Sequence, residues 1–322
     1  MIKKQAIRLT IEWPTLAVAL LIYSAFGTLS WQYHNLPWWL IVPTAAYLIA
    51  WHGSLQHEVV HGHPTSWPWL NRLLILPSLW LWLPFELYRE SHQRHHQNEQ
   101  LTDPQQDPES YYLSALQWHK LPPWRQALYW SLNTVSGRLL LGPFFALAAL
   151  ARQESRCLRT GTKQILSVWG LHLLGCALVL YWVIALCHIP LADYLLLFVY
   201  PGISLSLLRS FLEHQAHPDS RQRTVAIEAH PLMALLFLNN NLHILHHTEP
   251  SLPWYRLPAR WRERREELLA LNGNYCYSGY AEVIARYFLW PKEPPVYPQD
   301  LAQNLAHPVP ITNAPDRSAI AV

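Results

Sequence analysis

The stretch His243-Ile244-Leu245-His246-His247 has the pattern H-x-x-H-H and lies near the end of a long apolar chain. The same pattern occurs upstream at His92-Gln93-Arg94-His95-His96, and a related box, His57-Glu58-Val59-Val60-His61, precedes both. These three boxes hold eight of the eighteen histidines in the chain. We therefore expect the rest of the chain to hold the boxes together around metal at the edge of a membrane.

The composition is that of a membrane protein. Apolar residues make up 51% of the 322 residues and charged residues only 14%, against roughly 25% charged residues in soluble domains. The 17 Trp residues suit a bilayer surface, where one end of a side chain is apolar and the other is wet. The net charge of +3 gives no indication of nucleic-acid binding, and the four cysteines lack the spacing of a disulfide framework or a C-x-x-C site.

Two long apolar intervals predict membrane spans. No Asp, Glu, Lys or Arg occurs from residue 13 to residue 57, and a spanning helix needs about 20 apolar residues. A second long interval begins at Gln164. We expect two helical hairpins, with spans over residues 13–33 and 37–56 and over residues 164–187 and 191–210.

Three further apolar runs, 73–85, 139–151 and 231–238, are too short to span. We expect them to form interfacial helices or re-entrant segments buried against protein. The Trp and Leu side chains within 79–85 either line the path of an acyl chain or anchor the chain at the interface, and anchoring is the preferred interpretation.

The distribution of Lys and Arg sets the expected orientation. The two hairpin turns contain neither residue, whereas the first ten residues contain three and segment 86–163 contains nine. The termini, the middle loop and all three boxes are therefore expected on the cytoplasmic side, in the inner membrane of a bacterial-type cell. The expected fold is all-α, with about four transmembrane helices in two hairpins, interfacial helices and a cytoplasmic histidine-rich cap.

The last part of the chain differs in composition from the rest. Residues 294–322 are rich in Pro, Ala and Asn without periodicity, which predicts a loosely ordered tail. We therefore expect one membrane domain over residues 1–293, followed by this tail.

The histidine spacing predicts metal binding. Helical residues i, i+3 and i+4 share one face, so each H-x-x-H-H box is expected to direct its three imidazoles toward one point, and His57 and His61 likewise. Neutral imidazole suits Fe, Zn, Cu or Ni. A single catalytic Zn uses three protein ligands, so eight or nine histidines suit two ions better. Two redox-active irons beside a bilayer indicate dioxygen activation.

With these boxes, the chain resembles the membrane fatty-acid desaturase superfamily over roughly residues 37–260. That superfamily also contains alkane hydroxylases, carotenoid ketolases and hydroxylases, and some acyl decarboxylases. The resemblance implies two non-haem Fe ions, O2 as co-substrate, a lipid or acyl-carrier substrate, and electrons from a separate donor such as ferredoxin and its reductase. It implies no catalytic residue beyond the metal ligands, which are His57, His61, His92, His95, His96, His243, His246 and His247.

Family members often use one more histidine, contributed after the second hairpin. The candidate here is His214, because Glu213 and His214 resemble the Glu-His pair of alkane hydroxylases, and His217 is the competitor. His63 is expected to lie behind the ligands or at the interface.

Carboxylates and carbonyls normally orient metal-bound imidazoles from behind. The candidates near the boxes are Glu58, Asp103, Asp107, Glu213 and Asn240. The acidic segment 102–109 provides such groups or is simply a solvated loop. Asn240 either caps the helix of the third box or holds a metal-bound water, and the cap is preferred.

One competing motif remains. His57-Glu58-Val59-Val60-His61 is also H-E-x-x-H, the zinc metalloprotease pattern with Glu as general base. Intramembrane zinc proteases add an Asp ligand beside Gly, and no Asp-Gly occurs in this chain. The protease interpretation also leaves both H-x-x-H-H boxes unexplained, so the desaturase-like oxidoreductase is preferred.

Overall fold

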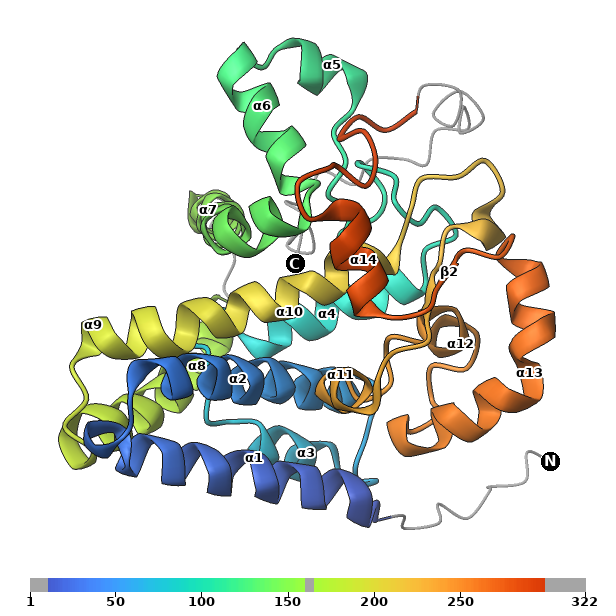
Figure 1. Ribbon diagram of the computed structural model, residues 1–322. Helices are drawn as coiled ribbons and strands as arrows, with labels where there is room; N and C mark the ends of the chain where they lie inside the picture. Colours follow the sequence, from blue (N-terminus) through green and yellow to red (C-terminus); the bar gives the residue numbers. More distant parts are fainter. Residues whose placement is uncertain (1–10, 160–164, 299–322) are drawn as a thin grey trace, which may run out of the picture.

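The computed structural model describes residues 11–159 and 165–298, which are predominantly helical (Figure 1). The longer helices are α1 (Trp13–Trp31), α2 (Trp38–Val60), α4 (Phe85–His96), α6 (Pro123–Leu132), α7 (Val135–Arg159), α8 (Ile165–Leu180), α10 (Tyr200–Glu213), α13 (Leu257–Leu271) and α14 (Tyr280–Tyr287). The shorter ones are α3 (Pro68–Leu74), α5 (Ala115–His119), α9 (Leu191–Asp193), α11 (Pro231–Leu236) and α12 (His243–Thr248). Two short strands, β1 (Ala226–Ile227) and β2 (Cys276–Tyr277), pair in parallel.

The first predicted hairpin is present. Helices α1 and α2 are joined by the 3₁₀ turn η1 (Tyr33–Asn35), and they pack against each other. Helix α2 continues beyond residue 56, the expected end of the second span, so the first histidine box lies on this helix and at its C-terminal end. His57 lies in the last turn of α2, and the helix ends only before Gly62, whose positive φ of 91° favours glycine.

The second predicted hairpin is also present. Helix α8 continues into the π-helical η2 (Tyr181–Leu186), and after a turn the chain runs through α9 and the π-helical η3 (Tyr194–Val199) into α10. Helix α10 packs closely on α2. Gly202 permits this approach, because a Cβ at that position would collide with the Ile49 side chain.

Within residues 11–159 and 165–298, four helical segments are long and apolar enough to cross a membrane: Trp13–Trp31, Val135–Arg159, Ser167–Leu186 and Leu191–Glu213. The number agrees with the prediction, but the set differs. Helix α2 is not among them, since its second half carries His52, Gln56 and other polar residues. Helix α7 is among them, because the apolar run 139–151 extends in both directions into a helix of 25 residues, and the expectation that this run is too short was wrong. Figure 1 shows α7 partly end-on, across the direction of α1, α2 and α10.

The other two short apolar runs behave as expected. Run 231–238 forms the short helix α11. Run 73–85 begins in the last residues of α3 and then continues as irregular chain that is buried against protein. Its side chains Leu79, Trp80, Trp82 and Leu83 are at most 6% exposed, so the preferred interpretation as interface anchors was wrong for them.

The arrangement separates the turns from the histidine boxes. In Figure 1 both hairpin turns lie at the left, whereas α12 and the histidine-bearing end of α4 lie toward the right. The beginning of the predicted tail is held in place, because Leu113 exchanges backbone hydrogen bonds with Pro295 and Tyr297. Residues 299–322 of that tail lie outside the described residues.

Candidate metal centre

All three histidine boxes lie on helices, as the spacing predicts. They occupy the C-terminal end of α2, the last turns of α4 and the short helix α12. Together with His214, which follows α10, they form two clusters in which the nitrogen atoms lie within 4.8 Å of one another. The first cluster is His57, His61, His92, His96 and His246, and the second cluster is His95, His214, His243 and His247.

Each H-x-x-H-H box contributes to both clusters, so the expectation that its three imidazoles converge on one point was wrong. In the second box, His92 and His96 join the first cluster, while His95 joins the second. The helical repeat explains the division. At about 100° per residue, positions i and i+4 are separated by about 40°, whereas i+3 lies about 60° away on the other side of i. The third box divides by the same rule.

The ring nitrogens converge within each cluster. In the first, the Nε2 atom of His96 lies 3.1 Å from that of His92 and 3.0 Å from that of His246. In the second, His214 Nε2 lies 3.0 Å from His95 Nε2 and 3.1 Å from His243 Nε2. The two clusters adjoin, since the rings of His96 and His247 stack with centroids 4.2 Å apart.

The chemistry of these groups fits metal ions. The Nε2 atoms of His57, His61 and His247 are buried and have no hydrogen-bond partner among the described residues. Burial, together with the neighbouring histidines, holds the pKa of His243 and His246 well below the usual value, so these imidazoles are neutral. Neutral imidazole is the form that ligates a transition metal, and unpartnered buried nitrogens are otherwise unfavourable.

Two acidic side chains from the segment after α4 orient histidines of the second box. Asp107 Oδ1 lies 2.8 Å from His95 Nδ1, and Glu109 Oε1 lies 3.1 Å from His92 Nδ1. Burial lowers the pKa of His95, but Asp107, together with Glu109 and Glu213, outweighs burial and raises this pKa to about 9. A carboxylate bound at Nδ1 directs Nε2 toward the metal position. The segment 102–109 is therefore not a solvated loop.

A chain of polar contacts supports the third box. Arg209 pairs with Glu213 at 2.9 Å, and Glu213 accepts a hydrogen bond from Asn240 at 3.1 Å. The Oδ1 atom of Asn240 lies 3.0 Å from His243 Nδ1. The preferred interpretation of Asn240 as a helix cap was wrong, because Leu242 occupies the cap position of α12. Sequence reasoning missed Arg209, although a charged residue four positions before Glu213 on an apolar helix was a usable signal.

Other candidates lie away from the nitrogen clusters. Asp103 accepts hydrogen bonds from the backbone of Gln105 and Gln106 and so shapes the turn. His63 pairs with Glu12 at 2.7 Å, and His217 contacts Asp219 of its own loop. Glu58 Oε1 lies 3.9 Å from His57 Nδ1, and its other oxygen accepts a hydrogen bond from the backbone N–H of Trp254. Glu58 therefore lies behind the first cluster.

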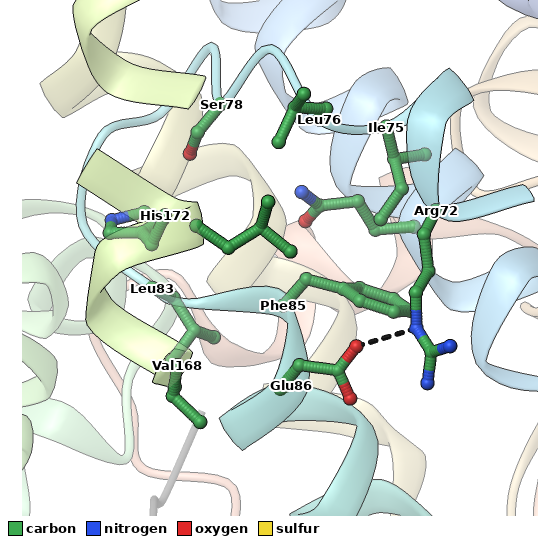
Figure 2. A pocket seen from close by; sticks show the side chains of 11 residues that line it. Arg72, Ile75, Leu76, Ser78, Leu83, Phe85, Glu86, Val168 and His172 are labelled. Atoms are coloured by element: carbon green, nitrogen blue, oxygen red, sulfur yellow. Dashed lines mark hydrogen bonds and ion pairs between the residues drawn. The ribbon is translucent and has the colours of Figure 1, made fainter. Parts of the chain in front are cut away.

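A small cavity adjoins the first box. It lies between α2, α3, α4 and α8, and Gln56, the residue before His57, lines it. Figure 2 shows Leu83, Phe85 and Val168 around this space and the ion pair of Arg72 with Glu86 at 2.7 Å. Part of the run 73–85 thus lines an apolar space beside the clusters.

Comparison with known families agrees with this geometry. The fatty acid desaturase family matches residues 33–279, a range that includes all nine clustered histidines. None of the curated proteins matches the chain.

Proposed function

Because this chain belongs to the fatty acid desaturase family, we propose that it is a membrane-bound di-iron oxidoreductase that introduces a double bond into a fatty acyl chain, using O2. The observation that carries this proposal is the pair of adjoining imidazole clusters, with five and four members. Nine histidines in two groups suit two ions better than one, since a single catalytic zinc takes three protein ligands and keeps a position open.

The first cluster would hold one iron and the second cluster the other. Two bound irons would supply, with O2, the oxidising power needed to remove hydrogen from an unactivated C–H bond. The side chains of the protein hold the ligands ready for this chemistry. Asp107 accepts a hydrogen bond from Nδ1–H of His95, and Glu109 accepts one from Nδ1–H of His92. Asn240 Oδ1 accepts one from Nδ1–H of His243. Each contact fixes a tautomer and leaves Nε2 free for metal.

The surroundings suit a substrate that comes from the bilayer. The clusters lie at the end of the helical bundle opposite the hairpin turns (Figure 1), and the bias of Lys and Arg favours the cytoplasm for that end. The acyl chain would enter between the helices, where Leu83 and Phe85 line the space beside the first box. Electrons would come from a separate donor such as ferredoxin and its reductase, in a bacterial-type inner membrane.

Glu58 has a position that suits this function better than proteolysis. A metalloprotease needs the Glu of H-E-x-x-H beside the metal-bound water. Here one oxygen of Glu58 is engaged by the Trp254 backbone, and the other faces the rear nitrogen of His57. We therefore place this carboxylate behind His57 and not beside a metal-bound water. Hydroxylation, ketone formation and decarboxylation would use the same histidines.

The proposal is tested by expressing the protein in membranes with O2 and a reducing system, and by profiling lipids by mass spectrometry against a His246→Ala control. New double bonds that depend on His246 are the expected result. Hydroxylated lipids or terminal alkenes in their place would assign one of the alternative outcomes. An unchanged lipid profile would refute acyl oxidation, while two irons per chain in purified protein would still support the di-iron class.

A further inference from the structure

A second polar site lies in the wall of the protein next to the metal centre. Residues of α6, α7 and α10 and of segment 110–113 enclose a cavity of about 170 Å³. Arg138, in the first turns of α7, lines this cavity and is only 8% exposed. Its Nε atom is buried without a hydrogen-bond partner among the described residues. A buried guanidinium normally has a carboxylate partner.

Nearby acidic groups do not supply that partner. The carboxylate of Glu293 is engaged by Lys292 at 2.7 Å and by the Tyr111 hydroxyl at 2.8 Å. Within the described ranges Arg138 forms no ion pair, and it lies instead over the rings of Tyr111 and Phe211. Among the described residues, this buried region therefore holds two cations, Arg138 and Lys292, and one carboxylate, Glu293. One positive charge is left uncompensated. An anion bound in the cavity would compensate it.

The rest of the lining matches an amphiphile. Tyr129, Asn133 and the exposed Arg152 are polar, whereas Leu132 and Phe145 are apolar. The cavity is also close to the metal centre, because Tyr111 forms part of its wall and places its hydroxyl 3.0 Å from the backbone oxygen of His214. A molecule held here by its head would have its first carbons beside apolar side chains.

We propose that Arg138 binds the anionic head group, a carboxylate or a phosphate, of an acyl ligand in this cavity. The anion site stands on the burial and missing partner of Arg138, and only its assignment to the substrate rests on the proposed function. The planar guanidinium suits either head group through paired hydrogen bonds. Arg152 lies at the exposed end and would attract the head group on entry.

The test measures binding of radiolabelled palmitate to the purified full-length protein in neutral detergent. Unlabelled palmitate, hexadecyl phosphate, methyl palmitate and inorganic phosphate serve as competitors. We expect Arg138→Gln to weaken palmitate binding roughly ten- to hundredfold, the contribution of a hydrogen-bonded charge. Arg125→Gln, which changes an exposed arginine on α6 outside the cavity, should leave binding unchanged. Either unlabelled palmitate or hexadecyl phosphate will displace the radiolabelled palmitate more strongly, and the stronger of the two identifies the preferred head group.

A second pair of variants keeps the test decisive if Arg138→Gln does not fold. Ala149 lines the cavity, whereas its neighbour Ala148 is exposed and does not. Ala149→Phe should reduce palmitate binding and Ala148→Phe should not. Equal binding by both variants, or equal competition by methyl palmitate and palmitate, would overturn the proposal. Displacement by inorganic phosphate as effective as by the acyl anions would show a free-anion site and overturn the head-group assignment.

This binding assay requires neither iron nor electrons. An inactive protein that binds palmitate through Arg138 would therefore refute the proposed function alone. An active desaturase in which Arg138→Gln binds palmitate normally would refute the head-group site alone.

Discussion

The Nε2 atoms of His96 and His246 lie 3.0 Å apart, although 150 positions separate the two residues in the chain. The next residue, His247, belongs to the other cluster and stacks on His96 with a centroid distance of 4.2 Å. Consecutive residues of one short helix thus face different metal positions. The two boxes of the pattern H-x-x-H-H join the clusters to each other, and neither cluster is built from one box.

The division of the third box predicts different metal losses for two neighbouring variants. His246→Ala removes a ligand of the first cluster, and His247→Ala removes one of the second. We expect each variant to retain about one iron per chain instead of about two, and to lose desaturation, because both ions are needed. Iron analysis with Mössbauer spectroscopy should show a different remaining site in each variant. The same remaining spectrum in both would contradict the division.

The position of His214 predicts a contrast with His217. His214 lies 3.0 Å from His95 and 3.1 Å from His243, whereas His217 contacts only its own loop among the described residues. His214→Ala should therefore lower the iron content toward one per chain, and His217→Ala should leave it near the wild-type value. The measurement is iron per chain in purified protein. Iron loss in His217→Ala with retention in His214→Ala would reverse the assignment.

The spacing of the boxes was enough to predict helices and a metal centre, and the two long apolar intervals were enough to predict two hairpins. Helical periodicity is a local property, so it is visible in the sequence. The position of α7 was not, because polar residues beyond residue 151 obscured a helix that continues to Arg159. The burial of Trp80 and Trp82 was also missed, since the preference of Trp for interfaces does not reveal what packs over it.

The candidate site shows the same limit. All nine proposed ligands were found from spacing and resemblance, but their division between two clusters required the relative rotation of three helices. Asp103 and Asp107 lie in the same acidic segment and each precedes a Pro, so nothing in the sequence favours one of them. Only Asp107 contacts a clustered histidine. Asn240 is three residues before His243, a spacing compatible with a cap, and its contact with Glu213 depends on α10. Such long-range contacts cannot be read from local sequence.

Glu58→Gln separates oxidation from proteolysis. An amide at this position can still accept the hydrogen bond from the Trp254 backbone, which one oxygen of Glu58 accepts at 3.2 Å. We expect acyl oxidation to fall by roughly tenfold or less, at or below the lower end of the usual effect of a residue behind a metal ligand, because Glu58 lies 3.9 Å from His57 Nδ1. A zinc protease would lose its general base and all activity. Complete loss of a proteolytic activity in Glu58→Gln, with unchanged metal content, would favour the protease.

Asp107→Asn should act on the metal centre through His95. The carboxylate accepts the His95 Nδ1 proton at 2.8 Å and also accepts the Thr102 backbone N–H. We expect a loss of roughly ten- to hundredfold in metal affinity or activity, as is usual when such a partner is removed. Asp103→Asn is the matched control in the same segment, because Asp103 serves the turn. Iron titration should therefore distinguish the two variants, and equal effects would mean that loop stability alone matters.

The buried histidines predict a limited pH range of stability for iron-free protein. Burial, reinforced by neighbouring groups, lowers the pKa of His92, His96, His214, His243, His246 and His247. The unfolded chain takes up these protons near pH 6.5 and the folded chain does not, so stability falls as the pH drops below about 6.5. Glu109, whose pKa burial raises to about 7, opposes this as a single group.

His95 limits the alkaline side of this range. Its folded-state pKa of about 9 lies above the ordinary value, because the carboxylates of Asp107, Glu109 and Glu213 outweigh burial. Its stabilising effect is therefore present below about pH 6.5 and is lost progressively as the pH rises toward about 9. We expect the unfolding temperature of iron-free protein in detergent to be highest near pH 6.5 and to decline as the pH rises toward about 9, and Asp107→Asn to weaken this alkaline decline selectively. Replacing the exposed His119 by Gln should change neither side. A rise in unfolding temperature on acidification from pH 7 to pH 5 would show that the six histidines with lowered pKa values are not neutral in the folded protein.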